Sequence, residues 1–197
     1  MYELICIGAS WGGLQAIGQV LEDMPDELEQ PVVIAQHRHP DSLEGTFVEL
    51  LRQHTRRTVV DAEDKLAIEP RHVYVAPPNY HLLVERGWLA LSVDAQVSHA
   101  RPSIDVLFES AAHTYAERAI GIILTGANED GAAGLAEIKR RGGVALIQDP
   151  AGAIKRSMPD AAIAATVADA VLPLEEIGKF VYGLCVLPAP VRERTEA

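Results

Sequence analysis

The sequence is poor in cysteine and in positive charge. It contains two cysteines, Cys6 and Cys185, which form neither a CxxC pair nor a disulfide framework. This indicates a reducing compartment, and we expect the protein to be cytoplasmic. Lys and Arg total 17 against 28 Asp and Glu, which gives a net charge of −11. That balance disfavours a protein whose main task is to bind nucleic-acid phosphates.

The sequence also lacks a long hydrophobic run. Its longest uncharged stretch, residues 4–21, contains four glycines, two glutamines and a serine, so we expect no membrane insertion. The chain begins Met-Tyr-Glu without a basic region, which disfavours a signal peptide. With 197 residues and 48% hydrophobic content, one core is expected. We predict a single domain over residues 1–187 and a flexible C-terminal tail at 188–197.

Strand and helix patterns alternate along the chain. Short apolar runs predict strands at 3–8, 31–36, 72–77, 119–124, 143–147 and 168–172. Apolar residues at helical spacing predict helices around 14–21, 43–51, 102–115, 135–138 and 174–184, and Asp41-Ser-Leu-Glu44 resembles a capping box. Glu85-Arg86-Gly87 predicts a hairpin turn. The fold class expected is α/β, a doubly wound, mostly parallel sheet with helices on both faces and an antiparallel hairpin.

Three polar residues each follow a predicted strand. In such sheets ligands bind beyond the carboxyl ends of the strands. Ser10 lies among glycines in Gly8-Ala-Ser-Trp-Gly-Gly13, where it is either a simple helix cap or a nucleophile beside free backbone N–H groups. His37 is either a surface histidine or a general base. Asp130 is either a helix-start carboxylate or the acid that orients a histidine, and Glu129 is its local rival.

The coincidence of these three positions favours one site. Three parallel strand ends can converge on one crevice, and a Ser-His-Asp site for acyl transfer is the economical interpretation. His37 and His39 also suggest metal ligands, but no further donors cluster nearby, so we expect no metal and no cofactor.

Two familiar motifs do not apply. Residues 8–12 satisfy G-x-S-x-G, but in α/β-hydrolases the acid precedes the histidine, whereas here the last histidine, His113, precedes Asp130. The glycines also do not form the dinucleotide-binding pattern G-x-G-x-x-G.

With these residues in view, the chain resembles the catalytic domain of the CheB family, the chemotaxis protein-glutamate methylesterases. The segments that carry the resemblance extend along most of the chain: Ile7-Gly-Ala-Ser-x-Gly-Gly13, Gln36-His37, Val75-Ala-Pro77 with His81, Arg101-Pro-Ser-Ile-Asp-Val-Leu-Phe108, Leu124-Thr-Gly126, Asp130-Gly-Ala-Ala-Gly134, Gln148-Asp-Pro150 and Met158-Pro159. Together they are far more specific than a single triad residue.

The resemblance implies hydrolysis of methyl esters on chemoreceptor glutamates, and deamidation of receptor glutamines as a second activity. It implies Ser10 as nucleophile, His37 as general base and then acid, and Asp130 as the orienting carboxylate. The backbone N–H groups of Trp11 and Gly12 are candidate oxyanion donors. The expected partner is the methylated cytoplasmic region of a chemoreceptor. Arg38, Arg101 and Lys155-Arg156 could give a basic docking patch, although a solvated surface is the simpler interpretation for Lys155-Arg156.

This sequence departs from the family pattern in three respects. Trp11 replaces a common threonine and would narrow the crevice, and Ala127-Asn128 replaces Met-Gly. Family members usually carry an N-terminal receiver domain, whereas this sequence starts at the first strand, so a separate receiver-domain or chemotaxis signalling protein is a candidate partner. The alternatives are a serine esterase for another substrate, a catalytically silent binding module, and a receiver domain, which would need clustered acids after the first strand.

Overall fold

The computed structural model describes residues 1–39 and 45–186. Within these residues, seven strands form one sheet in which every neighbouring pair is parallel. In sheet order they are β3 (Thr58–Asp61), β4 (His72–Val75), β2 (Val32–Gln36), β1 (Leu4–Ala9), β7 (Ala119–Ile123), β8 (Val144–Gln148) and β9 (Ala170–Leu172). A separate antiparallel hairpin joins β5 (His81–Glu85) to β6 (Trp88–Ser92). The predicted fold class is confirmed.

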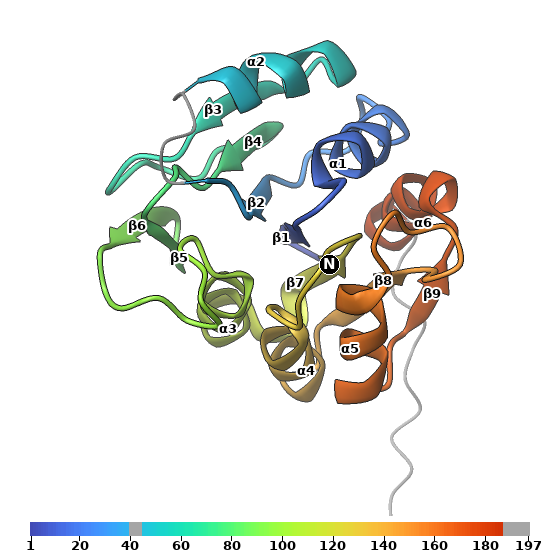
Figure 1. The fold of residues 1–197 in the computed structure, drawn as a ribbon. Coiled ribbons are helices and arrows are strands. Elements are labelled where there is room, and N and C mark those ends of the chain that lie inside the picture. The colour runs from blue at the N-terminus through green and yellow to red at the C-terminus, as the bar shows by residue number, and fades with distance from the viewer. Residues whose placement is uncertain (40–44, 187–197) are drawn as a thin grey trace, which may run out of the picture.

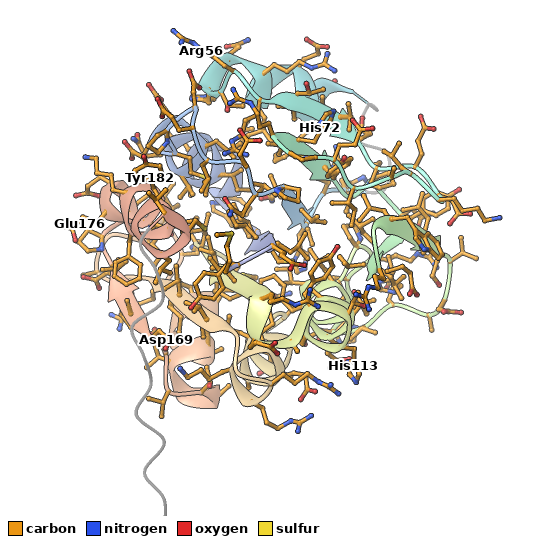
Figure 2. The ribbon with its side chains drawn as sticks, turned by 180° about the vertical axis from the view of Figure 1, so that it is seen from behind. Arg56, His72, His113, Asp169, Glu176 and Tyr182 are labelled. Carbon is orange, nitrogen blue, oxygen red and sulfur yellow. The ribbon has the colours of Figure 1, made fainter. Side chains whose placement is uncertain are left out.

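Helices cover both faces of the sheet (Figure 1). They are α1 (Gly13–Glu22), α2 (Thr46–Leu51), α3 (Ile104–Tyr115), α4 (Ala132–Arg140), α5 (Ser157–Ala165) and α6 (Leu174–Val186), with 3-10 turns at Arg52–His54 and Ala116–Arg118. The buried side chains of α1, α2 and α6 share one core cluster, and those of α3, α4 and α5 share another. Accordingly, Glu176 and Tyr182 on α6 lie on the opposite side of the molecule from His113 on α3 (Figure 2).

Strand β1 shows how one short apolar run serves both layers. All six of its residues are buried. Ile5, Ile7 and Ala9 pack in the cluster beneath α1, α2 and α6, whereas Leu4 and Cys6 pack in the cluster beneath α3, α4 and α5. Successive side chains of a strand point to opposite faces, so a sheet covered on both sides needs an unbroken apolar strand.

The chain reverses its direction across the sheet at β1. From β1 it moves to β2 on one side, and much later it returns to place β7 on the other side of β1. The carboxyl ends of β2, β1 and β7 therefore lie next to one another at the switch point, where ligands bind in open α/β sheets. Ser10 follows β1, His37 follows β2, and Asp130 lies in the loop between β7 and α4.

Some details differ from the sequence prediction. Neither β3 nor α5 was expected. Helix α2 begins at Thr46, after Gly45 in a left-handed conformation with φ of 78°, and Leu50 on its expected buried face is 38% exposed. The capping box at residues 41–44 and the tail at 188–197 lie outside the described residues. None of the helices in the two described ranges has the length and apolar content that a membrane crossing requires.

Candidate active site

Ser10 lies in a tight turn between β1 and α1. Its N–H donates to Thr125 O at 3.0 Å, and its carbonyl oxygen accepts from Gly13 N at 2.9 Å. Gly12 has φ of 82°, a left-handed conformation that disfavours residues with a side chain. Within residues 1–39 and 45–186, the N–H groups of Trp11 and Gly12 make no hydrogen bond. They remain available to an oxyanion next to Ser10.

Gln36 connects the serine segment to the histidine segment. Its Nε2 donates to Ser10 O at 2.8 Å and to His37 O at 2.9 Å. The main chains of Ser10 and His37 are thus held within reach of a single nitrogen atom. The other end of this amide, Oε1, is buried and finds no hydrogen-bond partner in the described part of the chain. A Cβ on Gly13 would come 1.9 Å from Oε1, so glycine is required there.

The structure brings His37 and Asp130 together. His37 Nε2 lies 2.7 Å from Asp130 Oδ2, although the two residues are 93 positions apart. Asp130 is completely buried, whereas the rival Glu129 is exposed and has no contact with His37 among the described residues. Likewise, across the described ranges, no hydrogen bond joins Ser10 Oγ to His37. Such bonds are often long before substrate binds.

The carboxyl group of Asp130 lies against the N-terminus of α3. Its Oδ1 accepts from Ser103 Oγ at 2.8 Å and from Asp105 N at 3.1 Å, and its Oδ2 accepts from Ile104 N at 2.7 Å. Burial opposes ionisation of this carboxyl group, but the hydrogen bonds from His37, the two backbone amides and Ser103 outweigh it and hold the pKa of Asp130 below its ordinary value. Asp130 is therefore an anion that can only accept, and His37 Nε2 must carry the proton.

A second buried carboxyl group lies beside Asp130. Asp105 is 9% exposed, and its Oδ1 accepts from Gly134 N at 2.7 Å. Burial, and then the charge of Asp130, raise the pKa of Asp105 to about 6, although backbone hydrogen bonds act in the opposite direction. The site thus contains two carboxyl groups whose surroundings shift their pKa values in opposite directions, a feature common at catalytic centres.

Three supporting residues did not stand out in the sequence. Ser103 caps α3 and binds Asp130, and its N–H donates to Nδ1 of the buried His81 at 3.2 Å. Gln148 Oε1 accepts from Thr125 N at 2.8 Å. Ser103, His81 and Gln148 belong to segments that carry the family resemblance, but nothing in their spacing shows what they bind. The sequence prediction began this helix at residue 102 and so placed Ser103 inside it, whereas α3 begins at Ile104 with Ser103 as its cap.

A groove runs from Ser10 between α1 and α2. It has a volume of about 470 Å³, and its lining residues are Ser10, Gly12, Gly13, Leu14, Gln15, Gln36, Arg38, Phe47, Leu50, Gln53 and His54. Trp11 is 64% exposed and is not one of the residues that line this groove.

The remaining nucleophile and metal candidates do not compete with this site. Cys6 and Cys185 are buried and unpaired, and burial raises the pKa of Cys185 to about 11. A buried, protonated thiol is inert. Within the part of the chain that the structure describes, no three His, Cys, Asp or Glu side chains are grouped as a metal ion requires.

A doubly wound parallel sheet with a serine, a histidine–aspartate pair and free amides at its switch point defines an α/β protein with a hydrolase-type site. The family model described as CheB methylesterase matches residues 5–181. The chain belongs to the CheB methylesterase family.

Individual relatives agree with this assignment. A Leptospira interrogans protein, provisionally named a protein-glutamate methylesterase/protein-glutamine glutaminase, is 46% identical over 179 residues, which cover 90% of this chain and 92% of that protein. A Burkholderia lata protein-glutamate methylesterase/protein-glutamine glutaminase is 44% identical over 90% of this chain. The Myxococcus xanthus protein-glutamate methylesterase FrzG is 40% identical over the same share. The chain spans 49% and 53% of the lengths of these last two proteins.

A solved structure shows the same fold. The crystal structure of the Thermotoga maritima CheB methylesterase catalytic domain matches with a TM-score of 0.88 and 29% identity. The match covers 93% of this chain and 99% of that domain. The match to the family fold therefore extends over nearly the whole chain.

Proposed function

We propose that this protein hydrolyses methyl esters of glutamate side chains in chemoreceptors during chemotaxis adaptation, and that the same site deamidates receptor glutamines. The observation that carries this proposal is the 2.7 Å contact between His37 Nε2 and Asp130 Oδ2, beside a serine whose turn presents unbonded amides. The names of the Leptospira and Burkholderia relatives include both activities. Both reactions use the same acyl transfer, with methanol or ammonia leaving.

The proposed catalytic residues are Ser10, His37 and Asp130. Ser10 Oγ attacks the ester carbonyl while His37 removes its proton, and the N–H groups of Trp11 and Gly12 stabilise the oxyanion. His37 then returns the proton to the departing methoxide, which leaves as methanol. Water, deprotonated by His37, attacks the acyl-enzyme and releases a glutamate carboxylate. A protein with a net charge of −11 does not hold this anionic product tightly.

The ring nitrogens of His37 have distinct roles in this scheme. Nε2 carries its hydrogen toward the acceptor-only Asp130, so the unprotonated Nδ1 is the base that serves Ser10. This reverses the usual triad, in which Nδ1 faces the aspartate and Nε2 faces the serine. Asp130 fixes the tautomer and stabilises the imidazolium that forms when His37 accepts the proton of Ser10.

The organisation around this site is also part of the proposal. We infer one catalytic domain over residues 1–187 and a cytoplasmic location. The partners are the methylated cytoplasmic region of a chemoreceptor and a separate receiver-domain or chemotaxis signalling protein that controls access. Neither partnership involves a metal or a cofactor.

The test uses the purified protein and a Ser10→Ala variant with methyl-labelled chemoreceptor, and it follows volatile methanol. We expect release by the parent and none by the variant. Equal release by both would show that Ser10 is not the nucleophile. If neither releases methanol, a fluorophosphonate probe separates the alternatives: labelling of Ser10 indicates an esterase for another substrate, and no labelling indicates a silent binding module.

A further inference from the structure

Two large apolar side chains are exposed beside the proposed nucleophile. Trp11 is 64% exposed and Ile154 is 55% exposed. Ile154 packs on the turn that follows Ser10, because a Cβ placed on Gly12 would lie 2.8 Å from Ile154 Cδ1. Ile154 therefore lies against the Trp11–Gly12 turn that follows Ser10. We call Trp11, Ile154 and Lys155 the Trp11 rim.

The main chain beneath this rim is fixed. Thr125 Oγ1 donates to Trp11 O at 3.0 Å and accepts from Lys155 N at 2.9 Å. Gly126 N donates to Lys155 O at 3.0 Å. The loop after β7 thus holds both rim segments, and the exposed side chains project from an immobilised backbone. Exposed aromatic groups on a rigid support are typical of the residues that dominate binding energy in interfaces.

The charge of the rim is opposite to that of the molecule. The chain carries a net charge of −11, yet Lys155 is exposed and forms no ion pair with any described residue. The other basic candidates are occupied. The side chain of Arg38 is 6% exposed, Arg156 pairs with Asp160 at 2.6 Å, and Arg101 binds Asn79 Oδ1 at 2.7 Å.

We propose that the Trp11 rim is the surface on which the glutamate-rich polypeptide segment that carries the ester docks. This inference rests on the proposed function. A segment that places its ester at Ser10 lies beside the adjoining Trp11–Gly12 turn. Trp11 and Ile154 contact apolar side chains next to the ester, and Lys155 pairs with an unesterified carboxylate of the same segment. The Trp11 rim then favours a polypeptide substrate over a small ester, because a small ester contacts the catalytic groups and not the rim.

The experiment compares two substrates. One is a methylated cytoplasmic fragment of a chemoreceptor, and the other is a single blocked glutamate γ-methyl ester. The test variant is Ile154→Asp. The matched control is Ile163→Asp, which makes the same change at a 42% exposed site on α5 outside the rim. Trp11 is left intact because its amide belongs to the proposed oxyanion site.

For Ile154→Asp we expect the ratio of kcat/KM for the receptor fragment to that for the small ester to fall about tenfold, through a higher KM, equivalent to about 1.4 kcal/mol. Ile163→Asp keeps the ratio of the parent. Lys155→Gln lowers the ratio at low salt, and the difference closes at high salt. Thermal melts of all variants confirm that they are folded.

Two results would refute the proposal that the Trp11 rim is the docking surface. One is an equal ratio for Ile154→Asp and Ile163→Asp, and the other is a loss of Ile154→Asp activity on both substrates alike. A parent that releases methanol from the small ester but not from the receptor fragment would instead refute the proposed function, and with it the rim.

Discussion

The carboxyl group of Asp130 shows how single contacts determine the proposed chemistry. It is completely buried, yet it receives hydrogen bonds from Ser103 Oγ and from the Ile104 and Asp105 amides at the positive end of the α3 dipole. Together with the hydrogen bond from His37, these donors outweigh burial and keep the carboxyl group ionised. The orientation of the imidazole therefore depends on the first turn of α3 as well as on Asp130.

Replacing Asp130 by Asn tests the orienting role. In asparagine one of the two carboxylate oxygens becomes an NH₂ group, which donates hydrogen bonds and cannot accept one from His37 Nε2. His37 then loses the tautomer that carries hydrogen on Nε2 and leaves Nδ1 free to act as the base. We expect kcat for ester hydrolysis to fall by about 10⁴-fold. The control is Glu129→Gln, a change of the exposed neighbour, which is expected to alter kcat less than twofold. Equal effects of the two substitutions would exclude Asp130.

Ser103 couples the stability of α3 to the site. Ser103→Ala removes the helix cap and the hydroxyl donor to Asp130, whereas Ser103→Thr retains a hydroxyl. Loss of the cap costs about 1 kcal/mol, which corresponds to a decrease of about 2–4 °C in Tm for a chain of this size. We expect Ser103→Ala to lower kcat as well, and Ser103→Thr to restore both quantities. A lower Tm with unchanged kcat would confine Ser103 to a structural role.

At the scale of elements, the turn between β1 and α1 shows a steric requirement. Gly12 and Gly87 both adopt left-handed conformations, with φ of 82° and 86°. A Cβ on Gly12 would meet Ile154, whereas one on Gly87 would meet no described atom within 4 Å. A side chain at either position would therefore strain the backbone, but only a side chain at Gly12 would also collide with a neighbouring residue.

Substitution by alanine separates these effects. Gly87→Ala carries the left-handed penalty alone, about 1 kcal/mol. Gly12→Ala carries that penalty plus displacement of Ile154, so we expect a larger loss of Tm and a loss of esterase activity that Gly87→Ala does not show. Thermal melts and methanol release measure the two. Equal Tm values would mean that Ile154 moves aside freely.

Elements with a clear apolar period were predictable from the sequence. The core strands and α3 follow directly from patterns such as Ile104, Leu107, Phe108 and Ala111, all of which are buried. Helix α5 was missed because it buries only Met158, Pro159 and Ala162, which span little more than one turn and give too short a stripe to stand out. Strand β3 was missed because four residues at a sheet edge give too short a run.

The same limit applies to the site. Ser10, His37 and Asp130 were identifiable because each follows a strand, but their catalytic assignment stays a prediction. The contact between His37 and Asp130 and the choice of Nε2 depend on the relative placement of segments 93 positions apart. No local pattern contains that information. The side-chain amide of Gln36 and the hydroxyl of Thr125 form hydrogen bonds with main-chain atoms. Every residue has these atoms, so such contacts cannot be predicted from the spacing of residue types.

For the whole molecule, the two buried carboxyl groups make stability depend on pH in opposite senses. The lowered pKa of Asp130 favours the folded state above its ordinary range, and this contribution is lost as pH falls through the lowered value. The pKa of Asp105, raised from 3.8 to about 6, disfavours the folded state above pH 6, and this cost disappears as pH falls from 6 toward 4.

The Asp105→Asn variant isolates the second contribution. Asn Oδ1 can still accept from Gly134 N, and the substitution removes the buried charge. We expect Tm of the variant relative to the parent to be several degrees higher at pH 8 than at pH 4, as measured by thermal melts across that range. A difference in Tm that does not vary with pH would contradict the assignment of Asp105 as a buried acid.

The position of β7 beside β1 has a consequence for synthesis of the protein. β1 is complete once residue 9 has been made, but its second neighbour begins only at residue 119. At about 5–20 residues per second, the ribosome needs about 5–20 s to cover that interval. During this time β1 lacks its second neighbour, so we expect the nascent chain to expose an apolar strand with an open edge, a surface prone to aggregation. Chains that terminate before β7 therefore contain Ser10 and His37 but lack Asp130. We expect them to bind chaperones rather than substrate.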